Sequence, residues 1–345
     1  MTVRFGLLGA GRIGKVHAKA ITGNPEARLV AVSDAMAEAA SSLAGQYGAE
    51  VRDTDTIIGA SDIDAVVICT PTDTHADLIE AAARAGKAIF CEKPIDLDVE
   101  RVKACLKVVD AEGATLMVGF NRRFDPHFEA VKAVVDRGEI GAVEMVTIVS
   151  RDPGAPPAEY VRRSGGIFRD MTIHDFDIAR WLLGEEIETV SAQASVLVDP
   201  AIGEAGDYDS ASVMLATASG KHATISNSRR ATYGYDQRIE VHGSKGAVAA
   251  ENQRPVSIEI ANAAGYTRPP LHDFFMTRYT EAYAREISRF IDCVKAKSPA
   301  TPSGIDGLIA LALAEAAVRS VKEGRAVKVS EVTGPLADRS VLQGR

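Results

Sequence analysis

The stretch VRFGLLGAGRIGK, residues 3–15, decides the fold of this chain. An apolar run at 3–8 leads directly into the pattern G-x-G-x-x-G. The glycines of this pattern are Gly9, Gly11 and Gly14, with Arg12 and Ile13 before the last of them. Between a strand and a helix, such glycines permit a tight turn, close approach of the backbone to a pyrophosphate, and close packing of the helix on the sheet. Because a helix N-terminus also attracts anions, the stretch predicts a dinucleotide-binding turn.

Short apolar runs alternate with helical periodicity as far as Asn121. The runs are apolar almost throughout, as strands covered by helices on both faces must be. Strands are expected at 3–8, 28–33, 65–69, 88–91 and 115–120, and helices at 15–22, 36–47, 75–85 and 99–111. This order predicts a Rossmann domain with a doubly wound parallel sheet over residues 1–121.

After Asn121 the pattern changes to strands in series. Helices are expected at 126–136, 173–183, 280–296 and 305–324, and a proline-rich loop at 152–158. Strands are expected at 142–150, 189–198, 210–216, 222–228, 237–242, 247–250 and 256–260. Short turns between strands favour an antiparallel sheet. Residues 122–332 are therefore predicted to form an α+β domain, followed by a polar tail at 333–345.

Composition narrows the possible partners. The chain has 345 residues and a formal net charge of −8, from 39 Lys and Arg against 47 Asp and Glu, which makes nucleic acid an unfavourable partner. No apolar run approaches the roughly 18 residues of a membrane span. Four scattered cysteines, without a C-x-x-C pair, favour a reducing cytoplasm over a disulfide framework or a zinc site; they are Cys69, Cys91, Cys105 and Cys293.

Asp34 closes the second expected strand, 20 residues after Gly14. At this distance a Rossmann domain places the carboxylate that accepts hydrogen bonds from the adenosine ribose. Its charge would repel a 2′-phosphate, and no Arg or Lys follows at 35–37 to pair with one. The pattern favours NAD over NADP, although an Asp at a strand end is also common without any ligand.

Lys93, within Glu92-Lys93-Pro94, follows the strand expected at 88–91. Ligands bind at this end of a doubly wound sheet, so its ammonium could polarise a substrate oxygen. An X-Pro bond can be cis, and the sequence leaves that open. An isolated lysine in a turn is more often a surface residue.

A second cluster, residues 165–177, indicates a loop that leads into a helix. Thr172 and Asp175 fit a T-x-x-D capping pattern, which would place His174 in the first helical turn. A helix N-terminus disfavours imidazolium, so His174 could act as a general base, with Asp170 close enough to orient it or the substrate. Taken singly, each of these residues is more often structural.

These motifs together resemble the Gfo/Idh/MocA oxidoreductase family over nearly the whole chain. They are GAGRIG at 9–14, Thr70-Pro71-Thr72 with His75, Glu92-Lys93-Pro94, GFNRRFDP at 119–126, and Asp170 with His174. Within the family, the segments 151–153, 164–166 and 170–177 resemble inositol 2-dehydrogenases most.

The resemblance implies roles for particular residues. Catalysis is implied for Lys93, Asp170 and His174. Cofactor binding is implied for the GAGRIG turn (Gly9, Gly11, Arg12, Ile13, Gly14), Asp34, Thr70, Pro71, Thr72, His75, Glu92 and Lys93. Substrate binding is implied for Asn121, Arg123, Asp152, Asp170 and His174, and more weakly for Tyr233 and Tyr235. It also implies a homo-oligomer, a dimer or tetramer, formed through an open sheet of the second domain.

The resulting hypothesis is NAD-dependent oxidation of a cyclic polyol, myo-inositol to scyllo-inosose, without a metal. A related dehydrogenase or reductase acting on another inositol isomer or a sugar is the nearest alternative. A nucleotide-sensing regulator would need the cofactor but no proton acceptor, so the presence of Lys93, Asp170 and His174 argues against it. A structural protein with a vestigial site is the remaining alternative.

Overall fold

The computed structural model describes residues 2–334. These divide into two compact units. The first unit contains the described chain up to Phe124 together with Glu281–Leu311, and the second contains Asp125–Thr280 and Ala312–Gly334. The first unit is therefore built from two separate stretches of the chain. The sequence predicted one continuous domain that ends at residue 121. Nearly all of the expected tail at 333–345 lies outside the described residues.

The first unit contains a six-stranded parallel sheet in the order β3-β2-β1-β4-β5-β6. Its strands are β1 (Val3–Leu8), β2 (Ala27–Ser33), β3 (Glu50–Val51), β4 (Ala65–Ile68), β5 (Ala88–Cys91) and β6 (Leu116–Val118). Every residue of β4 is fully buried, as expected for a central strand covered on both faces. The doubly wound parallel sheet predicted from the sequence is confirmed.

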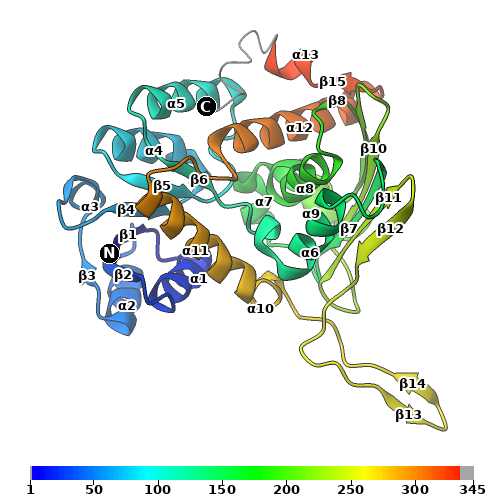
Figure 1. The fold of residues 1–345 in the computed structure, drawn as a ribbon, viewed down its shortest axis with the longest axis horizontal. Coiled ribbons are helices and arrows are strands. Elements are labelled where there is room, and N and C mark those ends of the chain that lie inside the picture. Colours follow the sequence, from blue (N-terminus) through cyan, green and yellow to red (C-terminus); the bar gives the residue numbers. More distant parts are fainter. Residues whose placement is uncertain (1, 335–345) are drawn as a thin grey trace. The chain divides into compact units, whose positions relative to one another are not determined.

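Helices flank this sheet in the first unit (Figure 1). They are α1 (Arg12–Thr22), α2 (Ala37–Tyr47), α3 (Thr54–Gly59), α4 (His75–Arg84), α5 (Val99–Ala111), α11 (Thr280–Ala296) and the first part of α12 (Gly304–Glu323), with single 3₁₀ turns at Thr72–Thr74 and Asn121–Phe124. The sequence did not predict β3 and α3, which are too short to show a period. Helix α1 begins three residues earlier than predicted, directly after Gly11.

The second unit contains a seven-stranded sheet in the order β12-β11-β7-β10-β9-β8-β15. Its strands are β7 (Val143–Arg151), β8 (Ile187–Ser195), β9 (Ser210–Thr217), β10 (His222–Ser228), β11 (Asp236–Gly243), β12 (Gly246–Ala250) and β15 (Val327–Lys328). Only the β7–β10 pair among these is parallel. The prediction of a mostly antiparallel sheet is confirmed.

Helices of the second unit lie on one face of this sheet (Figure 1). They are α6 (Pro126–Asp136), α7 (Ala158–Ser164), α8 (Ile173–Leu183), α9 (Pro200–Glu204), α10 (Phe275–Arg278), α13 (Ser330–Thr333) and the rest of α12, with a π-helical turn at Phe168–Thr172. Side chains alternate along the strands: Val213 and Leu215 are buried on the helical face, whereas Met214 is 54% exposed on the other. The opposite face of the sheet is therefore bare.

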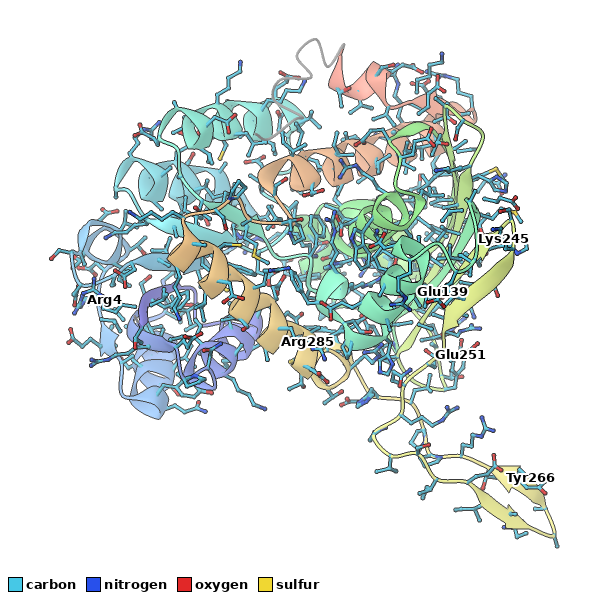
Figure 2. All side chains as sticks on the ribbon, viewed as in Figure 1. Arg4, Glu139, Lys245, Glu251, Tyr266 and Arg285 are labelled. Atoms are coloured by element: carbon cyan, nitrogen blue, oxygen red, sulfur yellow. The ribbon has the colours of Figure 1, made fainter. Side chains whose placement is uncertain are left out.

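The strand expected at 256–260 is wrong. Instead, β13 (Ile260–Asn262) pairs with β14 (Gly265–Thr267) in a hairpin that projects from the second unit (Figures 1 and 2). The side chain of Tyr266 near its tip is 77% exposed. The apolar alternation at 256–260 thus marks an exposed arm and not a buried strand. Within residues 2–334, no helix has the length and apolar character to cross a membrane.

Candidate functional site

The glycine-rich turn joins β1 to α1 in the first unit. Gly9 has a φ of +103°, and a Cβ there would lie 2.5 Å from the carbonyl oxygen of Cys69. A Cβ on Gly14 would lie 2.0 Å from the carbonyl oxygen of Gly9, so neither position admits a side chain. A Cβ on Gly11 would instead meet no atom within 4 Å. The turn is closed by packing at two glycines and opens into free space at the middle one, where a ligand can approach the backbone.

Asp34 lies directly after β2, beside this turn. Its Oδ2 accepts a hydrogen bond from the Ala10 N–H at 2.6 Å, and its Oδ1 accepts one from the Met36 N–H at 2.8 Å. The carboxylate therefore fixes the turn and still has lone pairs for a further donor. Arg12 and Ile13 form the first helical positions of α1, with Arg12 exposed and Ile13 half-buried.

His75 connects the ends of two neighbouring strands. Its ring is buried, with Nδ1 2.8 Å from the carbonyl oxygen of Pro94 and Nε2 2.8 Å from that of Thr70. Both ring nitrogens thus contact backbone, so His75 holds the 70–72 turn against the segment that carries Lys93. Pro71 and Thr72 lie at the exposed side of this turn, and the Lys93–Pro94 peptide bond is cis.

Glu92 points into the interior of the first unit. Its Oε1 lies 2.7 Å from Nε2 of His17, whose side chain is fully buried on α1. Nearby on α11, Glu286 is fully buried, and neither of its carboxyl oxygens has a hydrogen-bond partner among the described residues. Burial, and secondarily the charge of Glu92, raise the pKa of Glu286 well above its ordinary value.

Two further residues for which the sequence implied substrate binding lie in the 3₁₀ turn Asn121–Phe124. Asn121 is buried, and its amide nitrogen has no hydrogen-bond partner among the described residues. Arg123 donates to Oδ1 of Asp306, at the start of α12, at 2.9 Å. Asn121 therefore has a donor available, whereas the guanidinium of Arg123 already has a carboxylate.

In the second unit, Asp170 lies in the π-helical turn and His174 in the first turn of α8. The predicted capping pattern is wrong: Thr172 has helical φ and ψ angles, and its side chain makes no cap hydrogen bond. Its hydroxyl donates instead to the Ile167 carbonyl at 3.2 Å and to Asn227 Oδ1 at 2.8 Å. The π-helical turn continues into α8, so His174 does not lie at a free helix N-terminus.

Residues on and after β10 hold this helical segment in place. Asn227 on β10 is buried, accepts from Thr172, and donates to Oδ2 of Asp175 at 2.8 Å. Two positions on, the guanidinium of Arg229 faces Asp170. Because Asn227 and Arg229 are two residues apart, they point to the same, helical side of the sheet.

The immediate surroundings of Asp170 contain three residues that the sequence did not single out. The hydroxyl of Tyr160, on α7, donates to Oδ1 of Asp170 at 2.9 Å. Nη2 of Arg229 lies 3.6 Å from Oδ2 of Asp170 and 3.7 Å from Oδ2 of Asp207. These residues come from a loop, a short helix and a strand end, with no shared motif; the only sequence signal is the charged pair Arg229-Arg230 directly after an apolar strand.

The two tyrosines among the remaining predicted substrate residues lie on opposite faces of the sheet. Tyr235 is buried against Phe274 and Tyr279 and belongs to the helical face. Asp152 directly follows β7, and its N–H donates to the Ser228 carbonyl at 2.9 Å. Tyr233 instead donates to Asp236 at 2.6 Å and accepts from Arg151 at 3.1 Å.

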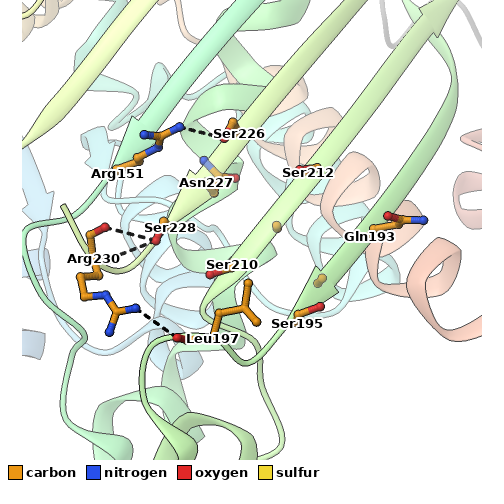
Figure 3. Close-up of a pocket in the computed structure, with 12 residues that line it drawn as sticks. Arg151, Gln193, Ser195, Leu197, Ser210, Ser212, Ser226, Asn227, Ser228 and Arg230 are labelled. Carbon is orange, nitrogen blue, oxygen red and sulfur yellow. Dashed lines mark hydrogen bonds between the residues drawn. The ribbon is translucent and has the colours of Figure 1, made fainter.

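Arg151 lies on the bare face, where it lines an open, serine-rich pocket (Figure 3). The structure therefore places Tyr233 on the side of the sheet opposite to Asp170.

Two family models match the chain. "Oxidoreductase family, NAD-binding Rossmann fold" matches residues 3–120, and "GFO/IDH/MocA C-terminal domain" matches residues 128–249. The chain belongs to the Gfo/Idh/MocA oxidoreductase family. The resemblance seen in the motifs is confirmed.

Relatives of known name resemble the chain along its length. It is 74% identical over 330 residues to the inositol 2-dehydrogenase of Rhizobium meliloti (strain 1021), which covers 96% of this chain and 100% of that protein. The crystal structure of a myo-inositol dehydrogenase from Corynebacterium glutamicum ATCC 13032 is 44% identical, with a TM-score of 0.92 and coverage of 95% and 99%. That of scyllo-inositol dehydrogenase from Lactobacillus casei, with bound NAD(H) and scyllo-inositol, is 31% identical, with a TM-score of 0.90 and coverage of 96% and 100%.

The first unit is the NAD-binding Rossmann domain of this Gfo/Idh/MocA oxidoreductase, and its residues fit the cofactor. Gly11 leaves open space beside the backbone, and the Asp34 carboxylate lies at the end of β2. A carboxylate at this place suits the ribose hydroxyls of NAD and opposes a 2′-phosphate. Among the described residues there is no cluster of three or more His, Cys, Asp or Glu side chains that could hold a metal ion.

Proposed function

We propose that this enzyme oxidises one secondary hydroxyl of a cyclic polyol, converting myo-inositol to scyllo-inosose with NAD as oxidant. The observation that carries the proposal is the 74% identity, along 96% of this chain, to an inositol 2-dehydrogenase. NAD, when bound, accepts a hydride at C4 of its nicotinamide. The chain must then bind the polyol, orient one carbon and remove one hydroxyl proton.

His174 is the proposed proton acceptor. Its place in α8 is fixed by the bonds that Thr172 and Asp175 make to Asn227. Lys93 would stabilise the negative charge that develops on the substrate oxygen, since an ammonium group favours an alkoxide. Asp170 would orient His174 and a second hydroxyl of the substrate. General-base assistance of this kind contributes typically about 10²- to 10⁴-fold in rate.

Oxidation of a different inositol isomer is the second candidate. The Lactobacillus casei structure, which carries scyllo-inositol, has a TM-score of 0.90 to this chain. A common fold and a common carboxylate–imidazole pair would serve either isomer, because the two inositols differ only in the orientation of one hydroxyl. A sugar dehydrogenase or reductase of the same family is a more distant candidate.

Initial rates of NADH formation with myo-inositol, scyllo-inositol, other isomers and a set of aldoses test these candidates. We expect the highest kcat/KM for myo-inositol, with the ketone product identified by NMR. A higher kcat/KM for scyllo-inositol would favour the second candidate, and activity on aldoses alone would reject the inositol assignment.

His174→Ala tests the proton acceptor. We expect kcat to fall by about 10²- to 10⁴-fold while the Kd for NAD stays unchanged. His242→Ala is the matched control, because this half-exposed histidine lies on β11, outside the site. Turnover of His174→Ala equal to that of the control would exclude the role.

A second copy of this chain is the proposed partner, seated on the bare sheet face in a dimer or tetramer. The centre of this face is uncharged, which is typical of interface cores. Its residues include Ser191, Gln193, Ser212, Met214, Thr224 and Ser226.

A cytoplasmic location stays a prediction. The four cysteines are free, buried thiols.

Light scattering coupled to gel filtration tests this interface. Met214→Arg places a charge on β9, an inner strand of this sheet, and should lower the oligomeric mass. Val51→Arg, at a 50% exposed position of the first unit, is the control and should leave the mass unchanged. An equal mass for both variants and the wild type would place the interface elsewhere.

A further inference from the structure

We infer that Arg229 is a positioning residue for the reaction: its buried guanidinium holds the carboxylate of Asp170 by charge and shares that charge with Asp207. This inference rests on the proposed function, because it takes Asp170 as a residue of the reacting site. Arg229 acts through Asp170 and does not itself touch the substrate.

The first observation is the burial of an incompletely bonded cation. The Arg229 side chain is 1% exposed, and its Nε and Nη2 have no hydrogen-bond partner among the described residues. A buried charge without hydrogen bonds is costly unless opposite charges lie close to it. The carboxylates of Asp170 and Asp207, at 3.6 and 3.7 Å, supply those charges. Because water cannot reach the guanidinium, a polyol hydroxyl cannot reach it either.

The second observation is that Arg229 and the other carboxylate it faces, Asp207, are each held by a backbone hydrogen bond. The Arg229 N–H donates to the Asp209 carbonyl at 2.8 Å. Oδ1 of Asp207 accepts from the Ile167 N–H at 3.0 Å, directly before the turn that carries Asp170.

Gly166, with φ of +84°, leaves the space that Asp207 occupies, since a Cβ there would lie 2.5 Å from Oδ1. Gly166 thus lets Asp207 approach the backbone directly before the turn that carries Asp170.

The third observation concerns how one positive charge serves two carboxylates. Burial raises the pKa of Asp207, the charge of Asp170 adds to that effect, and Arg229 together with the N–H groups of Ile167 and Tyr208 opposes it. Asp170 and Arg229 are the charged groups facing Asp207, and Tyr160 is the further titratable group on Asp170. If Asp207 took up a proton, it would become neutral, and Asp170 would be the one negative charge facing the Arg229 guanidinium. Loss of Arg229 would instead leave two carboxylates facing each other in a buried space.

A double-mutant cycle on Arg229 and Asp207 tests the inference. In Arg229→Met we expect kcat to fall by about 10²-fold, as for a misplaced catalytic group. The low-pH limb of kcat/KM should move to higher pH, and the Kd for NAD should not change. Adding Asp207→Asn removes the facing negative charge, so the double variant should be more active than Arg229→Met. Arg229→Lys keeps the charge and should retain most of the activity.

The outcomes separate this inference from the proposed function. A double variant no more active than Arg229→Met, or an unshifted pH profile, would overturn the charge-sharing role. Wild-type kinetics in Arg229→Met would overturn it as well. Wild-type kinetics in Asp170→Asn would instead reject the proposed role of Asp170. If Arg229→Met does not fold, the comparison of Arg229→Lys with Arg229→Gln gives the same decision.

Discussion

Two arginines of the second unit have almost the same burial but very different partners. The side chains of Arg278 and Arg229 are 3% and 1% exposed. Arg278 donates two hydrogen bonds to the carboxylate of Asp125, and its guanidinium lies 4.7 Å from the ring centre of Tyr279. Arg229 faces two carboxylates at 3.6 and 3.7 Å and hydrogen-bonds to neither.

The difference separates an ion pair that holds the fold from one that serves a site. Asp125 also caps α6, accepting from the N–H groups of His127 and Phe128. The pair with Arg278 therefore fastens α6 to the end of α10 through two hydrogen bonds, and only Nε of Arg278 has no partner among the described residues. Arg229 makes no hydrogen bond to either of its carboxylates, so it acts on them through its charge alone. Substitutions should accordingly affect stability at one arginine and catalysis at the other.

The largest expected effect is on the stability of Arg278→Met. Removing one partner of a buried, hydrogen-bonded pair leaves Asp125 charged and unpaired, which costs about 3 to 5 kcal/mol. Urea denaturation followed by circular dichroism measures this loss. The folded fraction should keep the kcat of the wild type.

Arg229→Met is the matched variant for this measurement. We expect a smaller loss of stability, because Asp207, whose pKa burial already raises, can take up a proton. If Arg229→Met loses as much stability as Arg278→Met and no more activity, the two arginines have the same role and the comparison fails.

The sequence predicted the first unit better than the second for physical reasons. Helix α5 begins and ends as predicted, because Asp98 caps it, accepting from the Arg101 N–H at 2.8 Å. The start of α8 carries a similar pattern at Thr172, but the π-helical turn before it makes a cap unnecessary. A local pattern of residues does not show that helical structure already precedes the expected start of a helix.

Glu286→Gln tests whether the buried carboxyl group of Glu286, which has no hydrogen-bond partner among the described residues, lowers the stability of the fold. The raised pKa of Glu286 means that its contribution to stability is full below the ordinary glutamate pKa and is lost as the pH rises toward the raised value. Glutamine is neutral throughout, so the variant should be more stable than the wild type at pH 8, by about 3 °C in Tm. At pH 5 the difference should be much smaller.

Thermal melts at the two pH values, with Glu281→Gln on the exposed side of α11 as control, measure this effect. A wild type that is more stable than Glu286→Gln at pH 8 would mean that the carboxylate has a stabilising role. In that case a buried group without hydrogen bonds can still stabilise the fold, and the missing hydrogen bonds of Arg229 would not indicate a role in catalysis.

The candidate site shows the same limit of sequence reasoning as α8. Lys93, Asp170 and His174 are recognisable because they stand in motifs, whereas Arg229 and Asp207 come from a strand end and a loop without one. Tyr233 was expected in the substrate pocket, yet it lies on the bare face with Arg151. Tyr233 lies in the turn before β11, where the side-chain alternation of a strand does not assign a face.

Tyr160→Phe measures how much the hydroxyl of Tyr160 contributes to the orientation of Asp170, compared with the charge of Arg229. Tyr160 is 51% exposed, and its bond to Asp170 competes with water. Loss of such a bond is worth about 1 kcal/mol, so we expect kcat to fall by about fivefold with no change in Tm. Steady-state kinetics beside Arg229→Met give the comparison. A loss as large as that of Arg229→Met would assign the orientation of Asp170 to Tyr160.

The smallest effect on stability is expected at an exposed ion pair whose N···O distance is shorter than the two distances at Arg229. Arg325 lies 2.7 Å from Glu331, and this contact helps to lower the pKa of Glu331 to about 2. The depressed pKa means that any stabilisation is present above the ordinary glutamate pKa and is lost as the pH falls toward 2. Because water and salt screen both groups, Glu331→Gln should leave Tm at pH 7 unchanged within about 1 °C. A drop as large as that of Arg229→Met would show that the length of an ion pair, and not its burial, sets its contribution.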